Sequence, residues 1–229
     1  MLIGIDGCPN AWIAITFANN QIASERVTDL AEFIDRTNPK VVAIDIPIGL
    51  VETGSRTCDI RARELLGRRK SSVFPAPILP AIAAKTRETA HEISITIHGK
   101  GVGAQSFGIY AKVKEVDDLL NDRPDLRERI YEVHPELCFY ALNGDTPMEH
   151  PKRTGPGFME RIALVTAEFG KSAFDDIRAQ HPRSKVADDD ILDAFAALWT
   201  AKRISVGRAA CVPNPPSRST SGIPMAIWR

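Results

Sequence analysis

The sequence lacks several features that would identify common classes of protein. Its four cysteines, Cys8, Cys58, Cys138 and Cys211, form no CxxC pair, which argues against a zinc ribbon or a thioredoxin-type site. No apolar run approaches the roughly 18 residues that a membrane-spanning helix needs. The opening MLIGIDGCPNAW has no basic segment followed by a long apolar one, so we expect no signal peptide, no membrane and a cytoplasmic location.

Net charge is also lacking. Lys and Arg together number 29, as do Asp and Glu, so the formal net charge is zero. This excludes a DNA binder that is basic throughout, although a local basic patch stays open. The 229 residues, 44% hydrophobic and 25% charged, are typical of a soluble globular protein that buries a large core without disulfides. The sequence shows no internal repeat and no low-complexity segment.

The N-terminal region predicts four strands and one helix. Residues 2–6, 11–18 and 21–27 are apolar or alternating runs separated by turn residues, which predicts three strands joined by tight connections. A helix is expected to open at Thr28-Asp29. Residues 41–46, VVAIDI, are almost wholly apolar, which is typical of a strand covered on both faces. The predicted order is therefore β-β-β-α-β.

The rest of the chain predicts an insertion and then a return to the sheet. Residues 47–128 break the strand rhythm, and we expect a mainly helical insertion there, with helices near 78–91 and 109–120. Residues 129–134 predict another strand. The predicted class is α/β, a mixed sheet of three antiparallel strands followed by parallel strands with helices on both faces, in a single domain over residues 1–229.

Two further helices and a last strand complete the prediction. Residues 156–169 carry a helical apolar pattern. Residues 188–204 are the clearest helix, because three acids open it and two bases close it, as the helix dipole favours. Residues 223–228 are apolar enough to dock back as an edge strand, after an irregular, proline-rich segment.

Acidic side chains occur where they are costly. Asp6 and Asp45 lie within predicted strands, and a buried carboxylate needs a partner or a cation. On the 188–204 helix, Asp190 and Asp193 share one face, as do Asp189 and Asp193. Such all-oxygen ligands suit Mg²⁺ or Mn²⁺ better than zinc or copper. The pattern predicts a metal site.

Each acid also has a structural explanation. Asp188 is suited to be the N-cap of its helix, and Asp189 complements the helix dipole. Asp6 could bond the amides of the turn after it, and Asp45 could cap the Pro47-Ile48-Gly49 turn. The metal site therefore rests on the combination of acids and not on any one of them.

The segment YEVHPELCF adds Glu132, His134 and Glu136. The three alternate, so they would share one side of a strand, although Pro135 makes a strand beyond His134 doubtful. Glu132 and His134 are candidates for a ligand or a proton-transfer group. A histidine satisfied by a hydrogen bond to a backbone carbonyl is the alternative for His134.

A basic segment covers residues 56–70, with six bases against two acids. Its guanidinium groups could hold phosphate oxygens, or they could be solvated partners of acids on a helix face. The candidates for binding a phosphate-bearing substrate are Arg56, Arg61, Arg63, Arg68, Ser72 and Lys152.

Several motifs together resemble a known family. They are GIDGCPNAW at 4–12, AIDIPIGL at 43–50, RTCDIRARELLGRRKSSVFPAP at 56–77, YEVHPELCF at 131–139, HPKRTGPGFMERIAL at 150–164, DDDILDAFAALWTA at 188–201 and GIPMAIW at 222–228. They look like the domain of unknown function 429 family, described as predicted nucleases of ribonuclease H-like fold. The DDDILDAFAAL stretch also resembles the acidic terminal helix of Holliday-junction resolvases.

The resemblance implies a metal-dependent phosphodiester hydrolase acting on nucleic acid or a nucleotide. It maps the acids onto Asp6, Asp45, Asp190 and Asp193, around one or two Mg²⁺ or Mn²⁺ ions. The first alternative is a non-catalytic module that binds a nucleotide or nucleic acid through the basic segment. The second is an actin-like phosphotransferase, which would need a homodimer because one chain supplies only one of the two domains.

Overall fold

The computed structural model describes residues 1–229, and the chain divides into two compact units. The first unit consists of Met1–Asp45, Arg129–Ala210 and Trp228–Arg229. The second consists of Ile46–Glu128 and Cys211–Ile227. The single domain that the sequence predicts stays a prediction.

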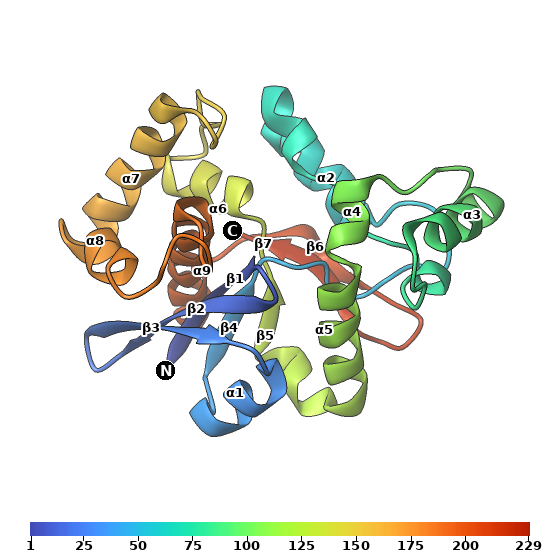
Figure 1. Ribbon diagram of the computed structural model, residues 1–229, viewed down its shortest axis with the longest axis horizontal. Coiled ribbons are helices and arrows are strands. Elements are labelled where there is room, and N and C mark those ends of the chain that lie inside the picture. The colour runs from blue at the N-terminus through green and yellow to red at the C-terminus, as the bar shows by residue number, and fades with distance from the viewer. The chain divides into compact units, whose positions relative to one another are not determined.

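The first unit is built on a five-stranded mixed sheet (Figure 1). Its strands are β1 (Leu2–Cys8), β2 (Ala11–Ala18), β3 (Gln21–Val27), β4 (Val41–Ile44) and β5 (Ile130–Glu132). Their order across the sheet is β3-β2-β1-β4-β5. The first three strands are antiparallel, whereas β4 pairs in parallel with both β1 and β5. The predicted α/β class and mixed sheet are confirmed.

One face of the sheet is covered by α9 (Asp188–Ser205), the longest helix. Gly4 on β1 is the reason for the close fit, because a Cβ there would lie 2.2 Å from the backbone nitrogen of Leu198 and 2.3 Å from the carbonyl oxygen of Ala194. Val41 and Ala43 of β4 belong to the same hydrophobic cluster as α9. The middle of α9 is almost wholly buried, so its apolar burial holds the helix on the strands.

The opposite face is apolar as well. Side chains alternate along a strand, so Ile3 and Ile5 point away from the face that carries Gly4, and both are fully buried. Helix α1 (Leu30–Thr37) lies on this side of the sheet (Figure 1). Its N-cap is Asp29, whose side chain accepts the Glu32 N–H at 2.9 Å. The sheet is therefore enclosed on both faces.

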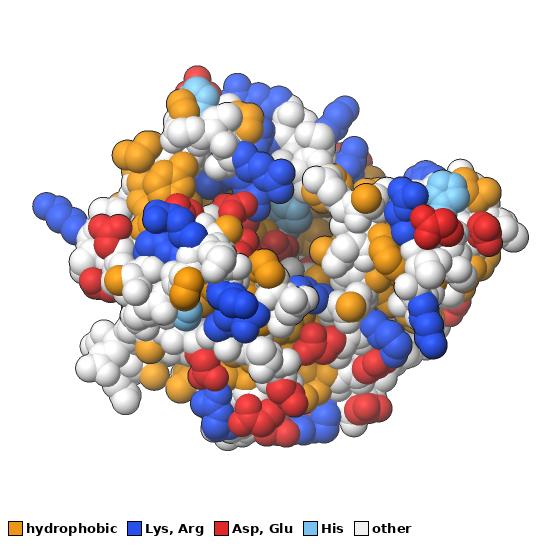
Figure 2. Space-filling model, viewed as in Figure 1, with side chains coloured by type: hydrophobic (Ala, Val, Ile, Leu, Met, Phe, Trp, Pro, Cys, Tyr) orange, Lys and Arg blue, Asp and Glu red, His pale blue; other side chains and the backbone are white.

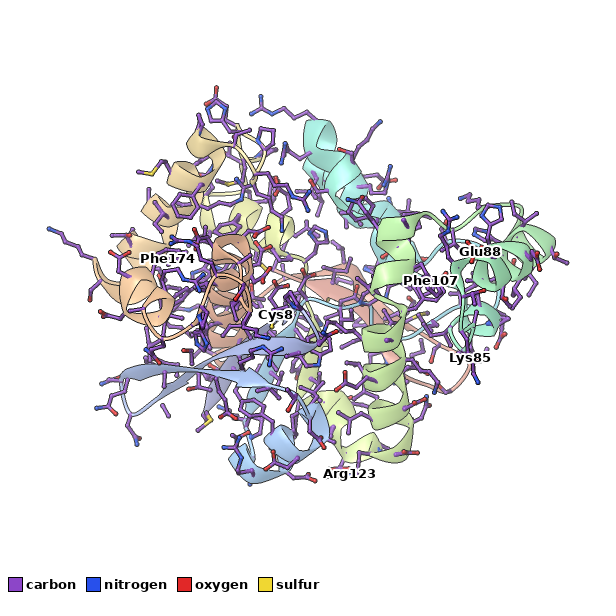
Figure 3. All side chains as sticks on the ribbon, in the orientation of Figure 1. Cys8, Lys85, Glu88, Phe107, Arg123 and Phe174 are labelled. Atoms are coloured by element: carbon purple, nitrogen blue, oxygen red, sulfur yellow. The ribbon has the colours of Figure 1, made fainter.

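Three shorter helices complete the first unit, α6 (Pro135–Leu142), α7 (Gly155–Phe169) and α8 (Ala173–Arg178). The sequence predicted α7 but neither α6 nor α8. Pro135, taken as the end of a strand, is instead at the start of α6, where a missing N–H costs nothing. Phe174 of α8, labelled in Figure 3, packs edge-to-face against Phe158 of α7 with ring centroids 5.6 Å apart.

The second unit is mainly helical. Its helices are α2 (Thr57–Leu66), η1 (Gly67–Ser72), η2 (Leu79–Ala81), α3 (Arg87–His98), α4 (Ala104–Gly108), α5 (Tyr110–Asp122) and η3 (Pro124–Glu128). The helix predicted at 78–91 is wrong. Its residues form η2 and the start of α3, because the Thr86 hydroxyl caps a new helix by accepting the Thr89 N–H at 3.2 Å.

The second unit also contains most of a hairpin formed by β6 (Cys211–Arg218) and β7 (Pro224–Trp228). The irregular chain expected after 211 is thus a strand. Its prolines are tolerated because a two-stranded sheet leaves one side of each strand without a ladder. The predicted edge strand at 223–228 exists as β7, but it pairs with β6. Its last residue, Trp228, belongs to the first unit, where it forms a parallel bridge with Val133.

Candidate functional site

Asp6 on β1 and Asp45 directly after β4 lie at neighbouring positions. Strands β1 and β4 pair in parallel with Ile5 opposite Ile44, so an aspartate comes next on each chain. The Asp45 N–H donates to the Ile5 carbonyl at 2.9 Å, which extends the ladder by one bond. Asp45 therefore lies directly after β4, whereas the sequence analysis placed it inside that strand. The register of the sheet brings the two carboxylates together.

Asp193 of α9 completes a group of three, which we call the aspartate cluster (Asp6, Asp45 and Asp193). One carboxylate oxygen from each lies within 4.8 Å of the other two. Asp6 is only 7% exposed and Asp193 only 2% exposed, so two of the three groups are almost removed from water. Asp193 can lie this close to Asp6 because its helix, α9, packs directly on β1 at Gly4.

The aspartate cluster is electrostatically strained. Burial raises the pKa of Asp6 well above its ordinary value of 3.8, and the neighbouring charges of Asp45 and Asp193 raise it further. Burial raises the pKa of Asp193 to about 6, although Lys152 opposes the shift. Both changes have the causes expected for carboxylates crowded in a poorly hydrated place. A cation held among these oxygens would relieve the repulsion.

Lys152 supplies one positive charge at this place. Its Nζ donates to Oδ2 of Asp193 at 2.6 Å and lies 3.4 Å from Oδ2 of Asp189. Burial lowers the pKa of Lys152, but the carboxylates of Asp193, Asp6 and Asp189 outweigh that effect and raise it above its ordinary value. The lysine is therefore protonated. The sequence assigned it to substrate phosphate, whereas the structure places its ammonium against carboxylates.

The loop that carries Lys152 is fixed at the start of α7. Thr154 caps the helix by accepting the Gly157 N–H at 3.1 Å, and its hydroxyl donates to the Pro151 carbonyl at 2.8 Å. A Cβ at Gly157 would lie 2.0 Å from that carbonyl oxygen, so only glycine allows the loop to fold back this closely. The TGPG sequence, a cap followed by glycine and proline, is a signal that could have located this loop.

Arg161 secures the same loop from inside. It is 1% exposed and donates to Oε2 of Glu136 at 2.8 Å and to the His150 carbonyl at 3.2 Å. Glu136 is thus the buried partner of an arginine, and no local pattern in the sequence indicates this pair. Removing one member of such a pair leaves a buried charge without compensation. The arginine joins α6, α7 and the loop that presents Lys152.

Asp190 lies outside the aspartate cluster. Its Oδ2 accepts the Ala187 N–H at 2.8 Å, so it caps α9. It was predicted as a metal ligand because it shares a helix face with Asp193, but it lies one turn nearer the free amides of the helix start. Asp188, expected to be the cap, instead pairs with Arg178 at 2.9 Å and Arg183 at 3.3 Å.

Glu132 and His134 do not join the aspartate cluster either. Glu132 is buried at the end of β5, paired with Ile44 of β4. The strand stops there, so the alternation that would align these side chains does not continue. His134 is the N-cap of α6, and its Nδ1 accepts the Glu136 N–H at 3.2 Å. The backbone partner of this contact is an N–H and not the carbonyl that the structural interpretation expected, and the ligand or proton-transfer role stays a prediction.

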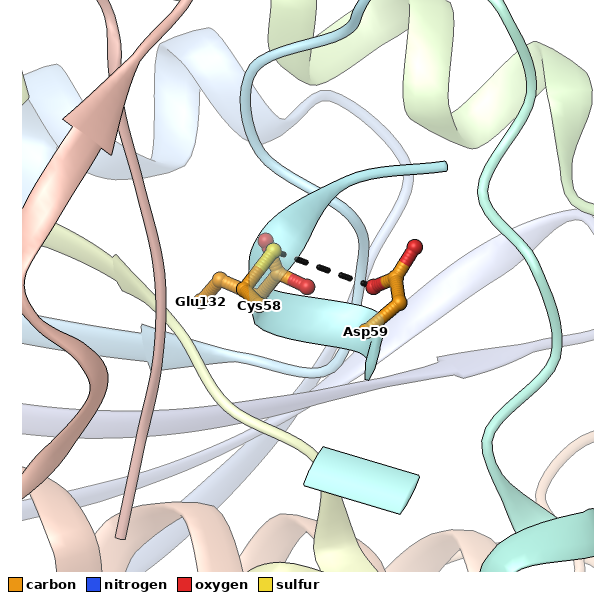
Figure 4. A group of neighbouring side chains, drawn as sticks. All are labelled: Cys58, Asp59 and Glu132. Atoms are coloured by element: carbon orange, nitrogen blue, oxygen red, sulfur yellow. Dashed lines mark hydrogen bonds between the residues drawn. The ribbon is translucent and has the colours of Figure 1, made fainter. Parts of the chain in front are cut away.

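Arg56 is part of the structural framework of the second unit. It is 2% exposed and donates to both carboxylate oxygens of Asp59, at 2.5 and 3.2 Å, and to the Ile48 carbonyl at 3.1 Å. Asp59 also accepts a weak hydrogen bond from Cys58, at 3.8 Å (Figure 4). These partners hold the guanidinium within the second unit, and the predicted contact of Arg56 with a substrate stays a prediction.

The other basic candidates differ in how far they are free to act. Arg63 donates to the Val73 carbonyl at 2.6 Å, and Arg61 forms an exposed ion pair with Glu64 at 2.8 Å. Arg68 is exposed and Ser72 half-buried. Figure 2 shows positive and negative side chains interspersed over the visible face. The predicted phosphate contacts of Arg61, Arg63, Arg68 and Ser72 stay predictions.

A cavity of about 560 Å³ opens beside Lys152. The start of α7 and the residues before it line one side, with Arg153, Thr154 and Phe158 among them. Asp188 and Asp189 from the start of α9 line the other. The lining thus includes two cationic side chains, a hydroxyl group and an aromatic ring. One of the two cations is Lys152, which also contacts Asp193.

Comparison with known proteins identifies a family. No curated protein and no solved structure gives a significant match to the chain. No helix has the length and apolar character that crossing a membrane requires. A family model described as "Protein of unknown function (DUF429)" matches residues 4–218, which is most of the chain. The chain therefore belongs to that family, as its motifs predict.

Proposed function

We propose that the protein is a metal-dependent phosphodiester hydrolase that acts on nucleic acid or a nucleotide. The observation that carries the proposal is the aspartate cluster, whose three oxygens lie within 4.8 Å of one another although two of the carboxylates are buried. Buried like charges are destabilising unless a cation compensates them. The chain supplies Lys152 as one cation against three carboxylates, which leaves an excess of negative charge.

The sheet supports the ribonuclease H-like fold that the motifs imply. Its order is β3-β2-β1-β4-β5, with three antiparallel strands followed by two parallel ones. In this arrangement an acid on the central strand and an acid after the next strand are neighbours, and a helix on one face adds the third. The positions of Asp6, Asp45 and Asp193 follow this pattern.

The donor set suits a hard divalent ion. Carboxylate oxygens are the ligands that Mg²⁺ and Mn²⁺ prefer, and the cluster contains neither sulfur nor imidazole. Asp6, Asp45 and Asp193 would hold the ion. Bound there, it would make a water molecule more acidic and stabilise negative charge on the phosphate. The residues of the chain would fix its place, and Lys152 and Arg153 would orient the anionic substrate.

The alternative is a module of the same fold that binds without turnover. The contact between Lys152 and Asp193 favours it, because a lysine that stays in place would neutralise a carboxylate that hydrolysis needs. The two functions differ in one measurable respect. The binding module requires no divalent ion, whereas the hydrolase does.

Substitution of the aspartate cluster tests the proposal. We expect wild-type protein with Mn²⁺ to cleave at least one of single-stranded, duplex and branched DNA or RNA, and EDTA to stop cleavage. Asp6→Asn and Asp45→Asn should each lower the rate on the order of 100-fold or more, because each removes a ligand. Product formation on denaturing gels measures the rate.

Asp176→Asn is the matched control, since it makes the same chemical change at an exposed residue of α8, outside the aspartate cluster. It should cleave like the wild type. Circular dichroism shows whether each variant is folded. Cleavage that persists in folded Asp6→Asn and Asp45→Asn, or that needs no divalent ion, would contradict the proposal.

A further inference from the structure

Lys152 contacts one of the carboxylates that would hold a divalent ion. Its Nζ lies 2.6 Å from Oδ2 of Asp193, a member of the aspartate cluster. A Mg²⁺ ion bound to a carboxylate oxygen lies about 2.1 Å from it, so an ion bound to Asp193 would share that carboxylate with the ammonium. Two cations this close would also repel each other.

The lysine reaches the aspartate cluster from the solvent side. Its side chain is 38% exposed, whereas that of Asp193 is 3% exposed. The ammonium can therefore be withdrawn without opening the core. The backbone of the loop is held by the Thr154 cap and by the bond from Arg161 to His150. What is free to move is the flexible four-carbon side chain alone.

The ammonium of Lys152 has a second position available, in the adjoining cavity. Lys152 lines the 560 Å³ cavity together with Arg153, which is exposed. An ammonium released from Asp193 would stand there beside a second positive charge. Two neighbouring cations are stabilised by an anion, and a phosphate group of the substrate has the required chemistry.

We propose that Lys152 is an internal cation that holds the aspartate cluster in the metal-free protein, competes with the divalent ion for it, and on release turns into the adjoining cavity to bind a substrate phosphate. The inference rests on the proposed metal site. It makes metal binding and phosphate binding cooperative, because the ion frees the group that the phosphate needs.

Mn²⁺ binding to the intact protein tests the competition. Lys152→Met keeps most of the length of the side chain without its charge, and we expect it to bind Mn²⁺ about tenfold more tightly or better, since no ammonium has to be displaced. Arg153→Met is the matched control. It removes one positive charge from the neighbouring residue, whose side chain also lines the cavity. This variant should leave the Mn²⁺ affinity within about twofold of the wild type. Isothermal titration calorimetry and Mn²⁺ electron paramagnetic resonance measure the affinity.

Inorganic phosphate tests the second position. It should bind wild-type protein more tightly when Mn²⁺ is saturating, and this gain should be lost in Lys152→Met. Should Lys152→Met be unfolded without metal, Lys152→Gln replaces it, because its amide can still donate a hydrogen bond to Asp193.

The outcomes separate the inference from the proposed function. Equal Mn²⁺ affinity in the wild type and Lys152→Met would overturn the inference and leave the metal site standing. Equal gains in Lys152→Met and Arg153→Met would also overturn it, since a general charge effect would then suffice. Absence of Mn²⁺ binding in all variants would overturn the metal site itself and the inference with it.

Discussion

At the scale of the residue, the same side-chain types serve opposite purposes within a few positions of one another. Asp188, Asp190 and Asp193 all lie in the first half of α9, but the first pairs with arginines and the second caps the helix. Only the third faces the sheet and joins the aspartate cluster. The three residues are of one type and differ in burial. Asp193 is the buried one, and a buried carboxylate is the one that most needs a cation.

Titration of Asp193 should be visible in the stability of the metal-free protein. Its pKa is raised from 3.8 to about 6, so between pH 4 and 6 the folded state binds more protons than the unfolded state. The free energy of unfolding therefore falls as pH rises through this window and levels off above it. The side chain of Asp193→Asn cannot ionise. As pH rises from 4 to 6, the free energy of unfolding of this variant should therefore increase relative to that of the wild type, by at most roughly 3 kcal/mol.

Urea unfolding in EDTA at several pH values from 4 to 7 measures this difference. Asp176→Asn, which changes an exposed carboxylate, should follow the wild type in parallel. A constant difference between wild type and Asp193→Asn across the window would contradict the prediction.

At the scale of the element, α9 decides where the third carboxylate lies. The helix approaches β1 so closely that Gly4 has no room for a Cβ. The sequence predicted α9 within a residue, because its acids, apolar face and closing bases are local signals. It did not predict α6, because a proline after a strand has two meanings and only the packing of the helix selects one.

Gly4→Ala should separate helix from strand. A Cβ at this position would lie 2.2 Å from the Leu198 backbone nitrogen, so α9 or β1 must shift. We expect a loss of about 1–3 kcal/mol of unfolding free energy. Mn²⁺ affinity should fall as well, because the shift carries Asp193 away from Asp6. Urea unfolding and Mn²⁺ titration measure the two effects.

Gly108→Ala is the control for this substitution, because no heavy atom lies within 4 Å of the Cβ it would add. It should unfold close to the wild type and bind Mn²⁺ equally well. If Gly4→Ala behaved in the same way as Gly108→Ala, the close approach of α9 would not govern the site.

At the scale of the whole molecule, the site exists only in the folded chain. Its three carboxylates come from β1, from the residue after β4 and from α9, which are far apart in the sequence. In the unfolded chain nothing holds them together. Binding of a divalent ion is therefore coupled to folding of the first unit.

Mn²⁺ should stabilise the protein against heat. An ion that binds only the folded state adds about 2.7 kcal/mol to the free energy of unfolding when its concentration is a hundred times the dissociation constant. The midpoint of thermal unfolding should rise with Mn²⁺ in the wild type and in Asp176→Asn, and should barely change in Asp6→Asn. Differential scanning calorimetry measures it. An equal rise in all three proteins would indicate binding elsewhere.

The sequence by itself determined the class of the fold, the first three strands, α9 and the acids that the aspartate cluster uses. These follow from local causes: alternation along a strand, the charges at helix ends, and the cost of a carboxylate in an apolar run. It could not distinguish Asp190 from Asp193, or find Arg56 and Arg161 buried, because those outcomes depend on which elements pack together. Only the tertiary structure decided that Lys152 faces Asp193. A contact between a loop and a helix that are distant in the sequence leaves no periodic signal along the chain.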